Sequence, residues 1–239
     1  MIRIAAIADV HVGVDSIGKL APHLEHLHDE ADVLLIAGDL TRIGTVAEAR
    51  ALVCELRGVD VPVVAVLGNH DYEGDHADEI TTILREAGVQ VLEGERTIVE
   101  IDGQRLGVAG TKGFGGGFAG ACASDSGEPE MKLFIRHTQE MANRLEQNLG
   151  ALDTDVRIAL LHYSPVEGTL HGERLEIWPF LGSYLLGEAI DHAGADLAIH
   201  GHAHGGAEKG HTAGGIPVRN VAQPVIKAAY RLFCFDGST

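Results

Sequence analysis

The sequence predicts an α/β fold, and three observations support this prediction. Short, mostly apolar runs alternate with amphipathic helical patterns, beginning with Ile2–Ala8, Val33–Ala37 and Val61–Leu67. Continuous apolar runs of this length are typical of parallel strands buried on both faces. The chain has 239 residues, of which 45% are hydrophobic and 22% charged, as in ordinary globular proteins. We expect one domain, 1–239, with a core large enough to need no disulfides.

The remaining elements continue the alternation of strands and helices. Helical patterns cover Lys19–Glu30, Thr45–Arg57, Ala77–Ala87, Glu130–Leu149 and Tyr184–Ala193. Further strands are expected at Val89–Leu92, Thr97–Ile101, Leu106–Ala109, Arg157–Leu161, Leu197–Ile199, Pro217–Val221 and Tyr230–Phe235. Asp102-Gly103 is a hairpin turn signal. Pro129 and Gly150 bound the longest helix, because proline suits a first helical turn and glycine an end.

Two segments lack such patterns. Gly110–Gly127 is rich in glycine with phenylalanine interleaved, and it suits either a flexible surface loop or a lid beside an active site. Val166–Leu181 is long enough to overhang a site at the strand ends. These two segments are expected to determine substrate choice.

The formal net charge of -17 limits the class of partner. An acidic surface repels polyanions, so a nucleic acid polymer is not an expected ligand. A phosphate substrate would need positive charge that bound metals supply. The three cysteines, Cys54, Cys122 and Cys234, form no C-x-x-C pair and are expected to be buried or idle thiols in a cytoplasmic protein. Neither a targeting segment nor a membrane span is recognisable.

Polar donors follow five of the expected strands directly. Ligands of open α/β sheets gather at the carboxyl ends of the strands, so these donors are expected at one rim. They are Asp9-Val10-His11, Gly38-Asp39, Gly68-Asn69-His70-Asp71, His162 and Gly201-His202-Ala203-His204. Each element alone is common turn chemistry or a structural histidine. The ordered set indicates a site.

Imidazole with carboxylate suits Mn, Fe, Zn or Ni, and the absence of thiolates argues against a structural zinc site. The donors are too many for one tetrahedral ion. Two ions about 3.5–4 Å apart and bridged by a carboxylate would use them all, and would turn a bridging water into a nucleophile at neutral pH. The identity of the metals is open.

At these residues the sequence resembles the calcineurin-like metallophosphoesterase superfamily, whose pattern is D-x-H, GD, GNH(D/E), H and GHxH. All five blocks occur in order between residues 9 and 204. The resemblance implies a four-layer α/β/β/α sandwich with two facing mixed sheets. It also implies that Asp39 bridges two ions, the first held by Asp9, His11 and His204 and the second by Asn69, His162 and His202.

The resemblance implies that His70 binds no metal and instead assists the leaving-group oxygen. An imidazole can donate a proton near neutral pH, which agrees with that role. The sequence differs from the family's Ser/Thr phosphatases at Arg42, the position at which those enzymes carry a second aspartate. Arg42 and Lys112 are candidate substrate contacts, with solvated surface residues as the alternative.

We therefore expect hydrolysis of a phosphoester by a metal-bridging hydroxide, with a small diester, such as a cyclic nucleotide, preferred. A phosphomonoesterase acting on nucleotides or small metabolites is the alternative, since the same ligands serve both. An inert binding protein on this fold is disfavoured because no ligand position is missing. A nuclease is disfavoured by the acidic charge. The sequence does not reveal the oligomeric state.

Overall fold

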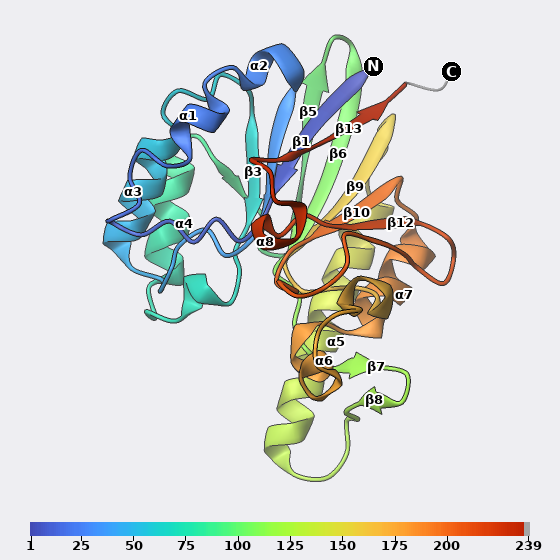
Figure 1. The fold of residues 1–239 in the computed structure, drawn as a ribbon. Helices are drawn as coiled ribbons and strands as arrows, with labels where there is room; N and C mark the ends of the chain where they lie inside the picture. The colour runs from blue at the N-terminus through green and yellow to red at the C-terminus, as the bar shows by residue number, and fades with distance from the viewer. Residues whose placement is uncertain (237–239) are drawn as a thin grey trace.

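The computed structural model describes residues 1–236, and two sheets organise them (Figure 1). The first sheet has five strands in the order β13-β1-β2-β3-β4. Its strands are β1 (Ile2–Ile7), β2 (Val33–Ala37), β3 (Val63–Val66), β4 (Gln90–Val91) and β13 (Arg231–Phe235). β1 to β4 are parallel, and β13 pairs antiparallel with β1. The sheet is mixed because the chain's last strand returns beside its first.

The second sheet has six strands in the order β11-β12-β10-β9-β6-β5. These are β5 (Glu95–Ile101), β6 (Gln104–Thr111), β9 (Val156–Leu161), β10 (Leu197–His200), β11 (Lys209–His211) and β12 (Pro217–Asn220). Its four central strands are parallel, and β5 and β11 pair antiparallel at the edges. The expected hairpin turn between β5 and β6 is confirmed, with φ of 48° at Asp102 and 80° at Gly103.

Three apolar clusters separate four layers. One lies between the sheets and joins residues such as Ile4 and Leu35 to Val108 and Ile158. The second packs the first sheet against α1 (Ala21–Leu24), α2 (Leu27–Glu30), α3 (Val46–Leu56) and α4 (Ala77–Glu86). The third packs the second sheet against α5 (Pro129–Gly150) and α7 (Tyr184–Ala193). The expected α/β/β/α sandwich is confirmed.

The single helix expected at Lys19–Glu30 is wrong. The structure has two short helices, α1 and α2, broken at Glu25 and His26. Leu20, Leu24 and Leu27 are nevertheless all buried. The apolar spacing therefore identified the buried face correctly, and packing of these leucines on the sheet does not require an unbroken helix.

Several short elements have no clear sequence signal. They are the 3-10 helices η1 (His70–Tyr72), η2 (Glu167–Leu170) and η3 (Leu175–Ile177), the helices α6 (Trp178–Leu181) and α8 (Gln223–Ile226), and the strands β7 (Gly117–Phe118) and β8 (Ala121–Cys122). Most of them lie in loops at the carboxyl ends of the strands. Such elements are too short for a periodic pattern to reveal.

The alternative of a flexible surface loop at Gly110–Gly127 is wrong for the first half of that segment. Gly115, Gly116, Gly117 and Phe118 are buried, and β7 and β8 form a hairpin. A Cβ at Gly117 would collide with the backbone of Ala121, so glycine permits the close pairing. Figure 1 shows this hairpin with α6 and one end of α5 below the sandwich.

Two other expectations concern the surface. All three cysteines are free and exposed, so burial of the thiols is wrong. Among residues 1–236 no helix is long and apolar enough to cross a bilayer.

Candidate metal centre

The carboxyl ends of β1, β2, β3, β9 and β10 meet at one rim of the sandwich, as their parallel order requires. Backbone bonds join the loops that follow, with Asp9 N–H donating to Gly38 O and His11 N–H to Asp39 O, both at 3.0 Å. Potential ligand atoms within 4.8 Å of one another form two groups, Asp9–His11–Asp39–His204 and Asp39–His162–His202. Asn69 Oδ1 lies 3.0 Å from His162 Nε2. The structure thus brings together all seven residues selected from the sequence.

Four of these residues have an unfavourable backbone conformation. Their φ angles are positive, at 59° for Asp9, 42° for His11, 50° for Asp39 and 68° for His202. Residues other than glycine seldom adopt this region, and such strain concentrates at functional sites. The loops are therefore held in shapes that direct these side chains inward at a cost in stability.

Two glycines of the motifs make room for the ligands. A Cβ on Gly68 would overlap Asp39, and a Cβ on Gly38 would overlap the His162 ring. Gly38 also has a φ of 85°, which glycine adopts without strain. The glycine before each ligand is thus explained by close approach as well as by turn geometry.

Asp39 lies at the centre of the cluster and is 1% exposed. Its Oδ1 faces His162 Nε2 at 3.2 Å, and its Oδ2 faces His11 Nε2 at 3.7 Å. The two oxygens therefore face the two ligand groups separately. The Oδ1 atom also accepts the backbone N–H of His70 at 2.9 Å, which fixes the orientation of the carboxylate.

Backbone carbonyls orient three of the imidazoles. The Nδ1 of His162 lies 2.9 Å from Ala37 O, the Nε2 of His202 3.1 Å from Phe180 O, and the Nδ1 of His70 2.7 Å from Arg42 O. A carbonyl only accepts hydrogen bonds, so each of these nitrogens carries its proton. The opposite nitrogen of His162 and of His202 is thereby left with a lone pair. This is the arrangement by which proteins prepare histidines as metal ligands.

The electrostatics of the cluster also suit cations. Burial holds the pKa of His162 well below its ordinary value and lowers that of His202 to about 3, so both rings are neutral, as ligands must be. Burial also raises the pKa of Asp9 to about 6, against the hydrogen bond from His204. Among residues 1–236, no lysine or arginine lies within ion-pair distance of Asp9 or Asp39. Buried carboxylates without a cationic partner are costly, and divalent ions at these donors would remove that cost.

His70 lies beside the ligands without belonging to either group. Its Nε2 is 3.9 Å from Asp39 Oδ2, and its ring meets the His11 ring edge-on at 4.6 Å between centroids. Its side chain is 34% exposed, so a substrate can reach it. Because Nδ1 is bound to Arg42 O, the Nε2 atom is available for proton transfer.

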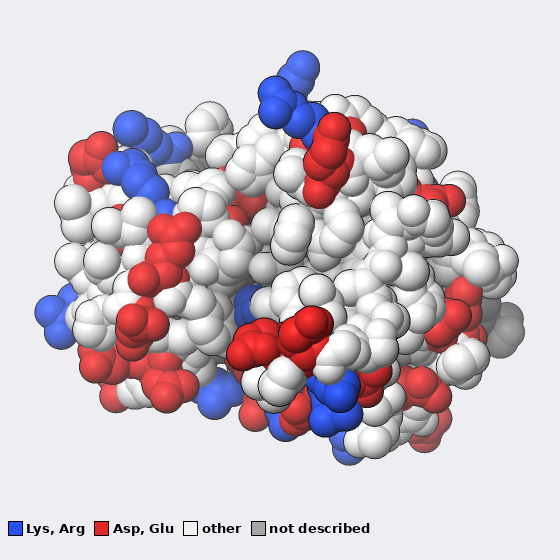
Figure 2. Space-filling view, turned by 90° about the horizontal axis from the view of Figure 1, so that it is seen from below, with Lys and Arg blue, Asp and Glu red and all other residues white. Residues whose placement is uncertain are grey.

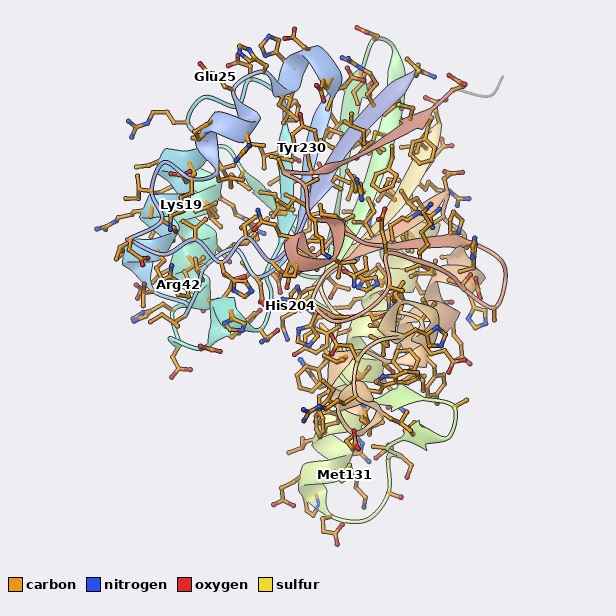
Figure 3. The ribbon with its side chains drawn as sticks, in the orientation of Figure 1. Lys19, Glu25, Arg42, Met131, His204 and Tyr230 are labelled. Atoms are coloured by element: carbon orange, nitrogen blue, oxygen red, sulfur yellow. The ribbon has the colours of Figure 1, made fainter. Side chains whose placement is uncertain are left out.

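The two candidate substrate contacts have different surroundings. The Arg42 guanidinium pairs with Asp15 at 2.7 Å on the surface, so the backbone carbonyl of this residue, and not its side chain, contacts the cluster. Figure 3 shows Arg42 to the left of His204, on the side of α3 and α4. Lys112 is 8% exposed and lies among aromatic rings. The alternative of a solvated lysine is therefore wrong.

Sequence reasoning missed Asp71 as a support of the site. This fully buried carboxylate accepts four hydrogen bonds, from Leu40 N–H, Thr41 N–H, Thr41 Oγ and Gly68 N–H. It thereby joins the loop of Asp39 to the loop of Asn69. Its place in the Gly68–Asp71 motif was a visible signal, but its bonding to the backbone of both loops is a tertiary fact.

Two further residues tie loops to the GHxH block. His200 is buried and bonds to Thr169 Oγ1 at 2.8 Å. Glu173 accepts the backbone N–H of Gly205. With Phe180 O on His202, these contacts show that the segment Val166–Leu181 does lie against the site.

Comparisons with known proteins agree with this geometry. The sequence matches the family described as calcineurin-like phosphoesterase over residues 2–206. No curated protein matches it. Among solved structures, the phosphopantetheinyl hydrolase of Mycobacterium tuberculosis has a TM-score of 0.70 at 16% identity, over 98% of this chain and 96% of that one. A hypothetical protein of Thermus thermophilus has a TM-score of 0.53 at 17% identity, over 92% and 75%.

The structural neighbours share the fold at low identity, and the family match covers most of the chain. The donor set at the rim, with its neutral buried imidazoles and unpaired carboxylates, fits the metal chemistry of that family. The chain therefore belongs to the calcineurin-like phosphoesterases and is a metal-dependent phosphoester hydrolase.

Proposed function

We propose that this protein hydrolyses a small phosphodiester with a pair of metal ions. Asp9, His11 and His204 would hold one ion, and Asn69, His162 and His202 the other, with Asp39 shared. The two-sided contacts of Asp39 support this division, and the identity of the metals stays open among Mn, Fe, Zn and Ni. When bound, the pair supplies Lewis acidity for the phosphoryl group and an activated water.

The chain's own residues perform the remaining tasks. His70, whose Nδ1–H is oriented by Arg42 O, would donate from the doubly protonated ring, in which Nε2 also carries a proton for the leaving-group oxygen. The carbonyls of Ala37 and Phe180 keep His162 and His202 in one tautomer, so their lone pairs need no reorganisation on binding. A cavity of about 500 Å³ beside Asn69 offers space for the second ester group. That space is the observation that favours a diester.

A monoesterase remains the second candidate because of one observation. Lys112 lines the same cavity as Asn69, and a cation there could neutralise the extra charge of a monoester. A comparison of p-nitrophenyl phosphate with bis-p-nitrophenyl phosphate separates the two. Faster hydrolysis of the monoester would make the monoesterase the favoured function.

The experiment begins with metal analysis of the purified protein, followed by rates on the aryl diester with Mn, Fe, Zn or Ni. We expect His70→Ala to lose activity by about 100-fold or more, as when a general acid is removed, while it keeps its metal. His76→Ala is the matched control, since His76 is exposed and, among residues 1–236, pairs with Glu79 alone. Equal rates for wild type and His70→Ala would exclude His70 from the mechanism.

Identifying the substrate requires rates on a panel of candidate phosphoesters. Because the Mycobacterium tuberculosis neighbour is described as a phosphopantetheinyl hydrolase, a phosphopantetheinyl ester belongs in it beside cyclic nucleotides and nucleotide monoesters. Cleavage of long single-stranded DNA in preference to the small diesters would contradict the proposal.

A further inference from the structure

Lys112 is a buried ammonium that the proposed reaction does not require. It follows β6 and is 8% exposed. Its Nζ lies 4.9 Å from the ring centroids of Tyr72 and Phe114 and 5.3 Å from that of Tyr163. Contacts of this kind stabilise an ammonium, but they leave its N–H donors unused. An ammonium has three donors to satisfy.

Within the described chain, these donors have no hydrogen-bond acceptor. The Nζ atom makes no hydrogen bond, and no acidic oxygen lies within 4.0 Å of it. Glu93 is its acidic neighbour, but the Glu93 carboxylate already accepts Leu67 N–H at 3.0 Å and Tyr72 OH at 2.9 Å. Lys112 therefore has charge and donors available for a ligand.

The ammonium lines a cavity of about 500 Å³ that also includes Asn69. The cavity extends from Asn69, a proposed metal ligand, to His137, Met141 and Arg144 on α5. Arg144 is already paired with Glu140 at 2.5 Å. In a chain with a net charge of -17, Lys112 is thus the unpaired cation of the cavity. Figure 2 views the molecule from below, where a few basic atoms are visible in the recess between its two halves.

We propose that this cavity is a substrate subsite in which Lys112 binds a second phosphate, carried by a part of the diester that does not react. The inference rests on the proposed diesterase function and adds a substrate class, diesters with a further phosphate. The rings of Tyr72, Phe114 and Tyr163 would cover the apolar part of the bound group. Lysine binds phosphate as a point charge, and such an attraction is stronger beside apolar rings than in bulk water.

Two aryl diesters that differ by one phosphate test this inference. They are thymidine 5′-(p-nitrophenyl phosphate) and the same compound with a 3′-phosphate. We expect wild type to have the higher kcat/KM for the bisphosphate compound. In Lys112→Met the ratio of the two kcat/KM values should fall about 10- to 100-fold, as for loss of a charge-assisted hydrogen bond, mainly through KM. Lys112→Arg should retain part of the preference.

The outcomes separate the alternatives. Equal kcat/KM for the two diesters in wild type, or an unchanged ratio in Lys112→Met, would overturn the subsite. A loss confined to p-nitrophenyl phosphate would assign Lys112 to the reacting phosphate instead, which also overturns it. Lys209→Met is the matched control, because Lys209 is an exposed lysine on the edge strand β11, and its ratio should equal that of wild type.

A binding measurement needs no turnover. By calorimetry, wild type should bind thymidine 3′,5′-bisphosphate more tightly than thymidine 5′-monophosphate, and Lys112→Met should lose most of that difference. If wild type cleaves neither diester, the proposed function fails, while this measurement still decides on Lys112. Circular dichroism identifies any variant that fails to fold. If Lys112→Met does not fold, Lys112→Arg is compared with wild type instead.

Discussion

At the scale of single residues, the site is built on groups that are strained or uncompensated. Asp9 and Asp39 are buried with positive φ angles and without lysine or arginine partners among the described residues. These features lower the stability of the metal-free protein, and bound cations would compensate for that loss. The residues that support the ligands are hydrogen-bonded far more completely, and Asp71 is the clearest case.

Asp71→Asn should therefore damage both stability and the site. Burial raises the pKa of Asp71 to about 6, so at about pH 8 the carboxylate is ionised and each oxygen accepts two donors. An amide replaces one oxygen with a donor that faces other donors. We expect the free energy of unfolding in urea to fall by about 2–4 kcal/mol, with less metal bound.

The control for this variant is Asp75→Asn. Asp75 is exposed in the same loop with a φ of 57°, a conformation that asparagine tolerates. If Asp71→Asn were as stable as wild type and bound as much metal, the hydrogen bonds of Asp71 would not be what holds the two loops together.

At the scale of elements, loops and short helices are held by side chains from other elements. The side chain of Glu55, near the end of α3, accepts the backbone N–H groups of Gly18, Leu20 and Ala21. Leu20 and Ala21 carry orphan donors at the start of α1, which has no side-chain cap of its own, and Gly18 lies just before it. A helix of four residues cannot be stable alone, so this contact explains why α1 exists.

Stability should depend on Glu55 and on pH. Burial raises the pKa of Glu55, but the hydrogen bonds from Gly18, Ala21 and Leu20 outweigh it and leave the pKa below its ordinary value. A depressed pKa stabilises the folded state above about pH 4.3, the ordinary glutamate value, and this stabilisation is lost as pH falls through the folded pKa. Glu55→Gln should cost about 1–3 kcal/mol at pH 7, with a smaller cost below about pH 4.

Urea unfolding of metal-free protein across pH measures this difference. Glu25→Gln is the control, since Glu25 is exposed at the end of α1 (Figure 3) and accepts no hydrogen bond among the described residues. A cost that stays constant from pH 7 to pH 3 would contradict the role of the ionised carboxylate.

At the scale of the molecule, the proposed ligands come from both sheets. Asp9, His11, Asp39 and Asn69 follow strands of the first sheet, and His162, His202 and His204 follow strands of the second. Metals bound here would join the two halves of the sandwich at one rim. Metal binding and folding are then linked, because the unfolded chain has no such site.

Metal should therefore raise the melting temperature of the whole chain. At about 100 times the dissociation constant, a ligand adds about 2.7 kcal/mol, which for a chain of this size is a rise of about 5–10 °C. Calorimetry of chelator-treated protein with and without Mn or Zn measures it. Asp39→Asn should lose most of the rise, and an equal rise in that variant would place the metal elsewhere.

The order of strands and helices could be predicted from the sequence because each has its own apolar pattern. The limits of β2 and α7 were predicted to the residue, and the limits of β1 and α5 were close. The expected helix at Lys19–Glu30 was not continuous, and β7, β8 and α6 were not foreseen, because each depends on contacts with distant backbone. The donor set at the rim was visible because parallel strands end at one edge.

By itself, the sequence determined the layered α/β fold, the family resemblance and the donors that meet at the strand ends, because these follow from local periodicity and from the direction of parallel strands. Only the tertiary structure decided that the Arg42 side chain pairs with Asp15, that Asp71 joins two loops and that Lys112 is buried among aromatic rings. The physical reason is that burial and pairing depend on neighbours far away in the chain. A lysine in the sequence carries no sign of the rings that surround it.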